Sequence, residues 1–502
     1  MRSHAGVESW GPEVAVLGAL LGFSALALIA NEMVGGSFLA GYRILSVSFM
    51  AAAVLHVASC CVRRPPAMNL WTVLLLFSTL FFVSGGIIGQ DPAAGSIARM
   101  TLAVQALFLL ALGLLGSWVG FRVVRGPSAA NGQWVDLCSR VQATRPAVVL
   151  LVVGAVWALR GYGGSQGLVL SHAGDVMAEA GAGASLAIHL GLLLRPLLLF
   201  LGGVLLFDRS PLQRSLGLAI MAGEIGWAVL WSRRQLFELI MVLLIVNLWT
   251  GRVTLRRLVG WTVVVAFTTL VMWPFMFHLR AVAQQTDLFR GDLTARASVL
   301  VNDVLPDAFG TFDPTKSFET GSEYLDNVQI RSRTSELLID IAAAHRDGAP
   351  LMGGDVLLAA VVATIPRVLW PGKERLLATE TWQVEELIER HFGLPIADVA
   401  STVLTHGYAD AGVLGAVLYM ALLGGLLGAS ERAGRRSGSA LLGLWVYALA
   451  LSLAVQIEAN VSDLFAVGRV ILAVVCVDRL AGRRIEQLTT IRPVRRLIEK
   501  TA

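Results

Sequence analysis

The residues best suited to chemistry in this chain are arginines that stand within or between apolar segments. Arg233 and Arg234 are adjacent in a short gap between two hydrophobic stretches, and Arg195 lies in the middle of a third stretch. A guanidinium in an apolar setting requires a counter-ion or a polar cavity. Its planar fork of N–H donors also fits phosphate oxygens through paired hydrogen bonds. These positions predict an anion-binding site suited to a phosphate or pyrophosphate group.

Each of these arginines also has a structural interpretation, which the sequence leaves open. Arg233 and Arg234 would then extend toward lipid headgroups at the edge of a membrane. Arg195 would form a buried salt bridge with Glu224 or Glu238, which stand in the next two hydrophobic stretches.

A second polar group opens a later apolar segment. His406 is followed by Tyr408 and Asp410. An imidazole titrates near neutral pH and can accept a proton. Asp410 lies four residues further on and hence on the same helix face, where it would orient the ring or serve as the base itself. The alternative is a histidine that only forms a hydrogen bond with a backbone carbonyl.

The composition shows which elements must hold these side chains. The chain has 502 residues, of which 56% are hydrophobic and 15% charged, whereas soluble domains carry about 25% charged residues. Its mean hydropathy is +0.69. This balance predicts an all-α integral membrane protein and excludes a soluble enzyme, and a net charge of +5 does not by itself indicate nucleic-acid binding. The four cysteines lack metal-ligand spacing, and no cofactor is expected.

The apolar segments predict a polytopic protein with twelve spans. A spanning helix needs about 20 mostly apolar residues. Basic residues gather after every even-numbered span, and the positive-inside rule then places both termini in the cytoplasm. The predicted spans are residues 12–30, 38–62, 69–89, 98–121, 146–161, 184–207, 215–231, 235–250, 258–278, 402–428, 439–458 and 463–479.

One long segment interrupts the spans and lies outside the cytoplasm on this topology. Helical spacing of apolar residues within it predicts short helices at 294–304, 334–345 and 381–392. Residues 351–369 are apolar but short, and predict a re-entrant or surface-lying helix. The chain therefore divides into an N-terminal bundle at 1–278, a loop at 279–401, three spans at 402–479 and a basic tail at 480–502.

Two motifs stand at the end of the loop. Residues 365–373 read IPRVLWPGK, and residues 401–415, which open the tenth span, read STVLTHGYADAGVLG. With Ser232 and Arg233 before the loop, these segments resemble the landmarks of the O-antigen polymerase (Wzy) type and of related oligosaccharide repeat-unit polymerases. That family has Pro-Arg-x-x-Trp-Pro-x-Lys followed by Ser…Tyr-x-x-x-Gly-x-x-Gly. Where it often has Asn-Phe-Gly, this chain reads Asp-Ala-Gly at 410–412.

The resemblance implies a fold and a reaction. The fold is that of the integral-membrane glycosyltransferases called GT-C, in the bacterial inner membrane. The substrates are glycan repeat units on undecaprenyl pyrophosphate, joined at the periplasmic face by inverting transfer without a metal. A chain-length co-polymerase is a further implied partner.

The reaction that the resemblance implies needs a leaving-group clamp and a base, and the residue types in this chain suggest which side chains could supply them. A cationic clamp would hold the pyrophosphate, His406 or Asp410 would be the base, and Trp370 and Tyr408 would stack on sugar rings unless they are interfacial anchors. The predicted clamp consists of Arg233, Arg234, Arg367, Arg195 and Lys373.

Other functions fit the same sequence. An O-antigen ligase-like transferase would use the same donor with a different acceptor. A lipid-linked oligosaccharide flippase or transporter would explain charged residues inside the bilayer, although such proteins often have two related halves, which this chain does not show.

Overall fold

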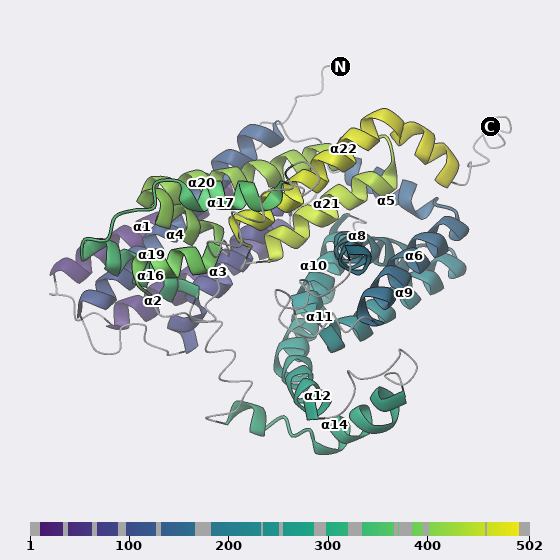
Figure 1. The fold of residues 1–502 in the computed structure, drawn as a ribbon, viewed down its shortest axis with the longest axis horizontal. Helices are drawn as coiled ribbons and strands as arrows, with labels where there is room; N and C mark the ends of the chain where they lie inside the picture. Colours follow the sequence, from purple (N-terminus) through teal and green to yellow (C-terminus); the bar gives the residue numbers. More distant parts are fainter. Residues whose placement is uncertain are drawn as a thin grey trace. The chain divides into compact units, whose positions relative to one another are not determined.

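Helices account for nearly all of the backbone that the computed structural model describes (Figure 1). In that part of the chain, β-type pairing is limited to one isolated bridge between Thr144 and Thr490. The structure describes residues 11–33, 39–62, 68–88, 97–126, 132–165, 182–231, 234–249, 255–285, 298–319, 334–365, 370, 384–394, 401–456 and 459–490.

Each of the twelve predicted spans coincides with a helix. The third to last of these segments, predicted at 402–428, is part of a longer helix that ends at Arg436. The helices at these positions are α1 (Gly11–Met33), α2 (Leu39–Val62), α3 (Leu70–Ile88), α4 (Ile97–Arg125), α6 (Pro146–Ser165), α8 (Ala182–Leu206), α9 (Pro211–Trp231), α10 (Arg234–Trp249), α11 (Leu255–Phe267) continued by η1 (Thr268–Met272) and α12 (Trp273–Gln285), α20 (Val403–Arg436), α21 (Ala440–Val455) and α22 (Val461–Thr489).

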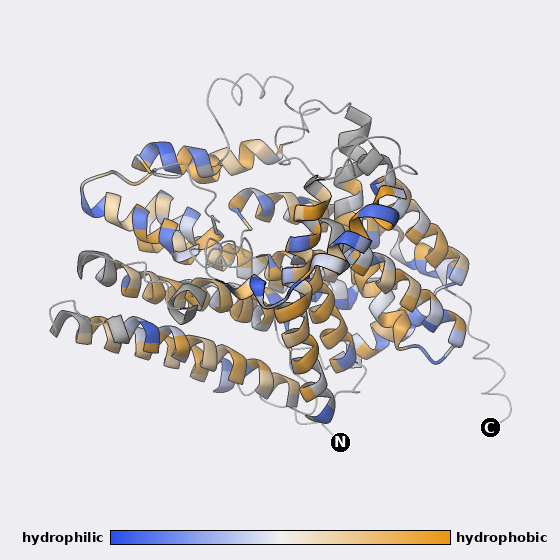
Figure 2. Ribbon diagram, turned by 90° about the horizontal axis from the view of Figure 1, so that it is seen from below, coloured by the Kyte–Doolittle hydropathy of each residue, from blue (hydrophilic) through white to orange (hydrophobic). Residues whose placement is uncertain are grey.

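Four helices in the described residues are long and apolar enough to cross a membrane. Their apolar segments are Pro12–Ala30, Tyr42–Cys61, Thr101–Arg125 and Val403–Arg436. Several other helices, α3 and α21 among them, contain shorter apolar segments. Figure 2 shows that hydrophobic residues dominate most of these helices. The helical fold class is therefore confirmed, while the count of twelve spans and the GT-C-like arrangement stay predictions.

Short helices occupy the region between α12 and α20. η3 (Leu300–Val304) and α14 (Leu305–Thr311) lie near the first predicted short helix, followed by the single turn η4 (Lys316–Phe318). α16 (Thr334–Arg346) and α19 (Val384–Phe392) coincide with the other two. The apolar segment at 351–369 contains α17 (Asp355–Thr364), a helix of ten residues. One more helix, α5 (Gly132–Gln142), lies between α4 and α6, where no span was predicted.

The chain forms two compact units, each built from segments distant in sequence. Unit 1 comprises Met1–Ala130, Asn327–Arg432 and Leu453–Ala473, and unit 2 comprises Asn131–Asp326, Ala433–Ser452 and Val474–Ala502. The segment at 279–401, predicted as one loop, is divided between them, so that η3 and α14 belong to unit 2 and α16, α17 and α19 to unit 1.

Glycines bring α4 and α20 close together in unit 1. A Cβ at Gly116 would lie 2.6 Å from the carbonyl oxygen of Val417, and one at Gly428 would lie 2.5 Å from that of Phe121. A Cβ at Gly424 would collide with the carbonyl of Ser117. Small residues at such spacing allow two backbones to pack directly, as is typical of membrane helices.

An aromatic cluster fills the middle of unit 2. Trp134 of α5 stacks on Trp249 of α10 with ring centroids 4.3 Å apart, and Tyr447 of α21 meets both rings edge-on. Phe200 of α8 completes the cluster against Trp249 and Tyr447. These buried rings join four helices, and they explain why α5 belongs to the fold.

The glycine contacts predict opposite effects at two helical glycines. Gly424→Ala should destabilise the protein by about 1–3 kcal/mol, because the new methyl group has no space against Ser117. Gly154→Ala on α6 is the control: nothing lies within 4 Å of its Cβ position, so it should stabilise by about 0.5–1 kcal/mol. Thermal unfolding in detergent measures both, and equal shifts would contradict the packing described.

Candidate functional site

Four charged side chains meet between the helices of unit 2. Arg160 of α6 donates through Nη1 to Glu224 Oε1 of α9 at 2.7 Å. Arg195 of α8 donates through Nη1 to Glu238 Oε2 of α10 at 3.0 Å, and its Nε lies 3.5 Å from Glu224 Oε2. The exposed fractions of the four residues are only 4%, 6%, 1% and 5% in chain order. We call these four residues the charged quartet.

The packing around Arg160 and Glu224 holds both side chains in place. The Arg160 guanidinium lies over the ring of Trp227, 5.1 Å from its centroid, in a cation–π contact. Trp157 donates through Nε1 to Glu224 Oε1 at 3.3 Å. A Cβ at Gly191 would stand 3.1 Å from Cγ of Arg160, and one at Gly223 would stand 2.5 Å from the Trp157 ring. Glycine at these two positions therefore makes room for the large side chains.

A proline follows Arg195 inside α8. Pro196 has no N–H to donate to the preceding turn. The carbonyl of Leu193, three residues before the proline, accepts a hydrogen bond from Trp445 Nε1 at 2.8 Å. The break in the backbone ladder thus coincides with the charged residue, and α21 braces the helix there.

The quartet leaves part of its hydrogen-bonding capacity unused. Among the described protein groups, Arg160 Nε, Arg160 Nη2 and Arg195 Nη2 donate to no acceptor. Buried guanidinium donors are costly when they lack acceptors. Oxygen atoms of an anion can satisfy them, so the quartet has the chemistry of a phosphate-binding group, although its four formal charges cancel.

The other predicted clamp residues are less fully described. Arg234 is the first residue of α10, one helical turn before Glu238. Arg233, Arg367 and Lys373 lie outside the described residues. Trp370 is described and its side chain is exposed.

The predicted base residues lie in unit 1, at the start of α20. His406 is fully buried, and its Nδ1 accepts a hydrogen bond from the N–H of Val461 at 3.3 Å. In a neutral ring that accepts at Nδ1, the proton is on Nε2. For His406 to accept a proton, the bond to Val461 has to open.

Asp410 is engaged by three donors. Its Oδ1 accepts from the N–H of Val356 at 3.0 Å, and its Oδ2 accepts from the N–H of Leu357 at 3.0 Å and from the Tyr419 hydroxyl at 2.5 Å. A carboxylate that binds the first N–H groups of a helix stabilises that helix end. Asp410 therefore fastens α17 to α20.

α20 is broken immediately after Asp410. Ala411 and Gly412 leave the helical conformation, and Gly412 has φ +61°, which favours glycine. Gly407 and Gly415 then face each other so closely that a Cβ on either would collide with the carbonyl of the other. Tyr408, which is half-buried, packs against the apolar cluster formed by α16, α17 and α19. The glycines of this motif thus serve the backbone geometry.

Two residues outside the predicted site take part in these contacts. Arg160, near the end of the fifth predicted span, belongs to the quartet. Arg469 of α22 donates through Nη1 to the carbonyl of Thr364, at the last turn of α17. The predicted span ended at residue 161, directly after Arg160, whereas α6 continues to Ser165 and holds Arg160 inside the helix.

Comparisons with protein-family models, curated proteins and solved structures gave no match to this chain. The assignment of a function therefore rests on the residues and their geometry.

The quartet predicts a strong dependence of stability on Glu224. Glu224→Gln should lower stability by about 3–5 kcal/mol, because it leaves two buried guanidiniums with one carboxylate. Glu386→Gln is the matched control, since Glu386 pairs with Arg390 on an exposed helix face, and such pairs contribute about 0–1 kcal/mol. Thermal unfolding in detergent compares the two, and similar losses would refute the importance of the buried pairs.

The contacts of Asp410 predict a local effect on α17. Asp410→Asn should speed hydrogen exchange across Asp355–Thr364, because the amide cannot accept from two backbone N–H groups and the Tyr419 hydroxyl equally well. Asp355→Asn, an exposed carboxylate on the same helix, should leave the exchange of this helix nearly unchanged. Hydrogen exchange with mass spectrometry distinguishes them. Unaltered protection in the Asp410 variant would show that α17 is held by other contacts.

Proposed function

We propose that this chain is a membrane glycosyltransferase that polymerises oligosaccharide repeat units carried on undecaprenyl pyrophosphate. The observation that carries the proposal is the charged quartet, in which two arginines with spare N–H donors are buried between apolar helices. The resemblance of residues 365–373 and 401–415 to repeat-unit polymerases supports the same function. In this proposal both termini are in the cytoplasm of a bacterium and the reaction takes place at the periplasmic face.

The reaction requires stabilisation of a leaving group. The hydroxyl oxygen of the acceptor sugar attacks the anomeric carbon of the donor chain, the bond from that carbon to the pyrophosphate oxygen breaks, and the hydroxyl proton passes to a base. Negative charge grows on the pyrophosphate as the bond breaks. Arginine N–H donors placed at that oxygen in advance would lower the barrier. Arg160 and Arg195 have the free donors for this role.

The charge balance of the quartet sets a condition on binding. Glu224 and Glu238 neutralise Arg160 and Arg195, so a pyrophosphate needs further cations. In the proposal, Arg233 and Arg234 supply them at the beginning of α10, next to the turn that carries Glu238. The two glutamates would keep the guanidiniums oriented between reaction cycles.

A flippase for lipid-linked oligosaccharides is a second candidate. It is favoured by the position of Arg195, which lies well inside α8 and is followed by a proline. Charged residues and broken helices of this kind are common along transport pathways. A ligase-like transferase would use the proposed pyrophosphate site unchanged, and differs only in its acceptor.

The test uses a strain that lacks the gene, complemented with the wild type or with single variants. Arg195→Lys keeps the charge but loses the planar donor fork, and should reduce polymer at least tenfold while single repeat units accumulate on the periplasmic lipid. Arg233→Ala, Arg367→Ala and His406→Gln test the other predicted roles. Arg346→Lys, at an exposed helix end, is the control. Lipid-linked glycans are measured by gel and mass spectrometry, with membrane abundance checked by immunoblot.

The location and length of the accumulated glycans separate the candidates. Single units trapped at the cytoplasmic face of the null strain would contradict the polymerase and support the flippase. Long lipid-linked polymer that never reaches its final acceptor would contradict the polymerase and support the ligase-like transferase. Normal polymer in the Arg195→Lys strain would remove the quartet from the catalytic site.

A further inference from the structure

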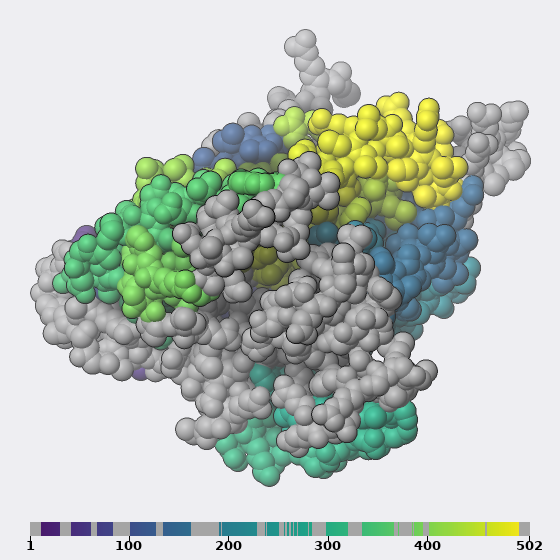
Figure 3. All heavy atoms as spheres, viewed as in Figure 1, coloured from purple at the N-terminus to yellow at the C-terminus, as the bar shows by residue number. Residues whose placement is uncertain are grey.

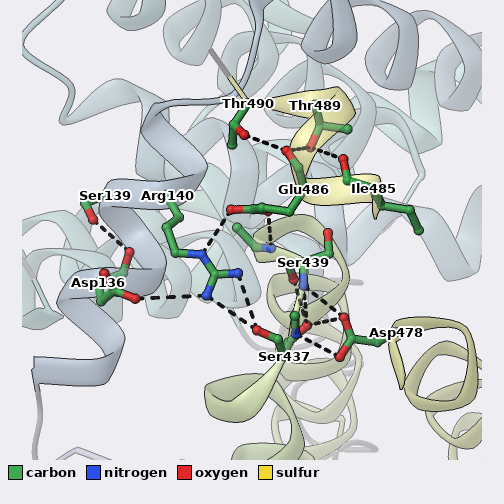
Figure 4. Close-up of polar contacts among 12 residues, drawn as sticks. Asp136, Ser139, Arg140, Ser437, Ser439, Asp478, Ile485, Glu486, Thr489 and Thr490 are labelled. Atoms are coloured by element: carbon green, nitrogen blue, oxygen red, sulfur yellow. Dashed lines mark hydrogen bonds and ion pairs between the residues drawn. The ribbon is translucent and has the colours of Figure 1, made fainter. Parts of the chain in front are cut away.

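The last three turns of α22 differ from side to side. On one side, two acidic residues bind the segment that leads into α21. Asp478 accepts hydrogen bonds from the Ser437 hydroxyl at 2.7 Å and from the N–H groups of Gly438 and Ser439 at 3.0 and 2.9 Å. Glu486 accepts from the N–H of Ala440 at 2.8 Å. Figure 4 shows these side chains directed at the beginning of α21. These two residues of α22 therefore attach the helix to the beginning of α21.

Arg140 of α5 strengthens the same attachment. Its Nε donates to Glu486 Oε1 at 3.0 Å, and its Nη1 and Nη2 lie 3.4 and 3.3 Å from the carbonyl oxygen of Ser437 (Figure 4). Asp478 and Glu486 are eight residues apart, a little over two helical turns, so both lie on one side of the helix. Their partners fix the rotation of α22 about its own axis.

The rest of the surface of these turns is exposed and has a mixed character. Leu480 and Leu488 are 87% and 71% exposed, and the side chains of Arg479, Arg483 and Arg484 are exposed as well. In the part of the chain that the structure describes, none of these three arginines forms an ion pair. Figure 3 shows this end of α22 at the molecular surface, in yellow. We call these five residues the α22 basic face.

The exposed side of α22 changes in composition along the helix. Just before Asp478 it presents Cys476 and Val477, which are apolar, and from Arg479 onward it presents arginines among leucines. α22 has 29 residues and is about 44 Å long at 1.5 Å per residue, whereas the hydrocarbon core of a bilayer is about 30 Å thick. If residues 463–479 are the last membrane span, as the sequence predicts, the change of composition marks the level at which the helix leaves hydrocarbon for the headgroups.

We propose that the α22 basic face binds anionic phospholipids of the bilayer, with the arginines at the lipid phosphates and Leu480, the leucine nearer to the apolar part of the helix, in the upper acyl region. Leucines this exposed are unfavourable in water, and three unpaired arginines attract anionic headgroups. A second copy of the chain fits this face poorly, because a twofold contact would bring its three arginines against three others.

The experiment uses the full-length protein in nanodiscs made from phosphatidylglycerol and phosphatidylethanolamine. The lipids retained after extraction are counted by native mass spectrometry. The triple variant Arg479→Gln, Arg483→Gln, Arg484→Gln should retain at least about five-fold less phosphatidylglycerol than the wild type, since each arginine near an anionic surface contributes about this factor. The corresponding triple lysine variant should retain wild-type amounts.

The matched control removes three exposed cations elsewhere: Lys316→Gln, Arg346→Gln, Arg390→Gln. It should bind phosphatidylglycerol as the wild type does, and an equal loss in the control would overturn the proposal. Wild-type retention by the triple glutamine variant, or a dimer that forms through α22 without regard to lipid charge, would also overturn it. Should the triple variant not fold, the wild type decides: its phosphatidylglycerol preference must weaken at high salt, and a salt-independent preference contradicts the proposal.

Discussion

A guanidinium buried among apolar helices must keep carboxylates beside it, and the arrangement of α6, α8, α9 and α10 depends on this requirement. Each helix contributes one member of the charged quartet, so a shift of any helix by one turn would separate a pair. The cost of an unpaired charge in such surroundings is several kcal/mol, comparable to the whole stability of many domains. The glycines and tryptophans around the quartet follow from it, because they shape the space in which the long side chains lie.

Helix ends have a similar requirement, because their backbone polar groups also need partners. The first N–H groups of a helix have no partner within the helix. In unit 1 they are bound by Asp410 at the start of α17, and in unit 2 by Asp478 and Glu486 at the start of α21. Carboxylates on one helix thereby position another helix that is distant in sequence. At the other end of α17, Arg469 donates a hydrogen bond to the carbonyl of Thr364, where a cation is favoured by the helix dipole.

Some polar residues use their hydrogen-bonding groups to support the fold, whereas others keep groups that could bind a substrate. The polar and glycine residues from His406 to Gly415 are largely explained by hydrogen bonds and close backbone packing. The quartet is different, because its arginines keep N–H donors that none of the described protein groups accepts. A preorganised set of donors in a site that excludes water is the arrangement by which enzymes stabilise growing negative charge. For that reason the proposed pyrophosphate site is centred on Arg160 and Arg195.

Most of the helices could be placed from the sequence alone, because hydropathy is a local property: an apolar stretch of about 20 residues has to bury its backbone polar groups in a helix wherever it lies. The short, polar helix α5 was not predicted. The sequence also identified Glu224 and Glu238 as possible partners of Arg195, but left open whether Arg195 forms a salt bridge or contacts a substrate. Only the tertiary structure decided that Arg160 joins them, that Asp410 binds α17 and Tyr419, and that the segment between α12 and α20 belongs to two units. Such partners are chosen by contacts between residues far apart in the chain, and neither residue spacing nor composition along one segment contains that information.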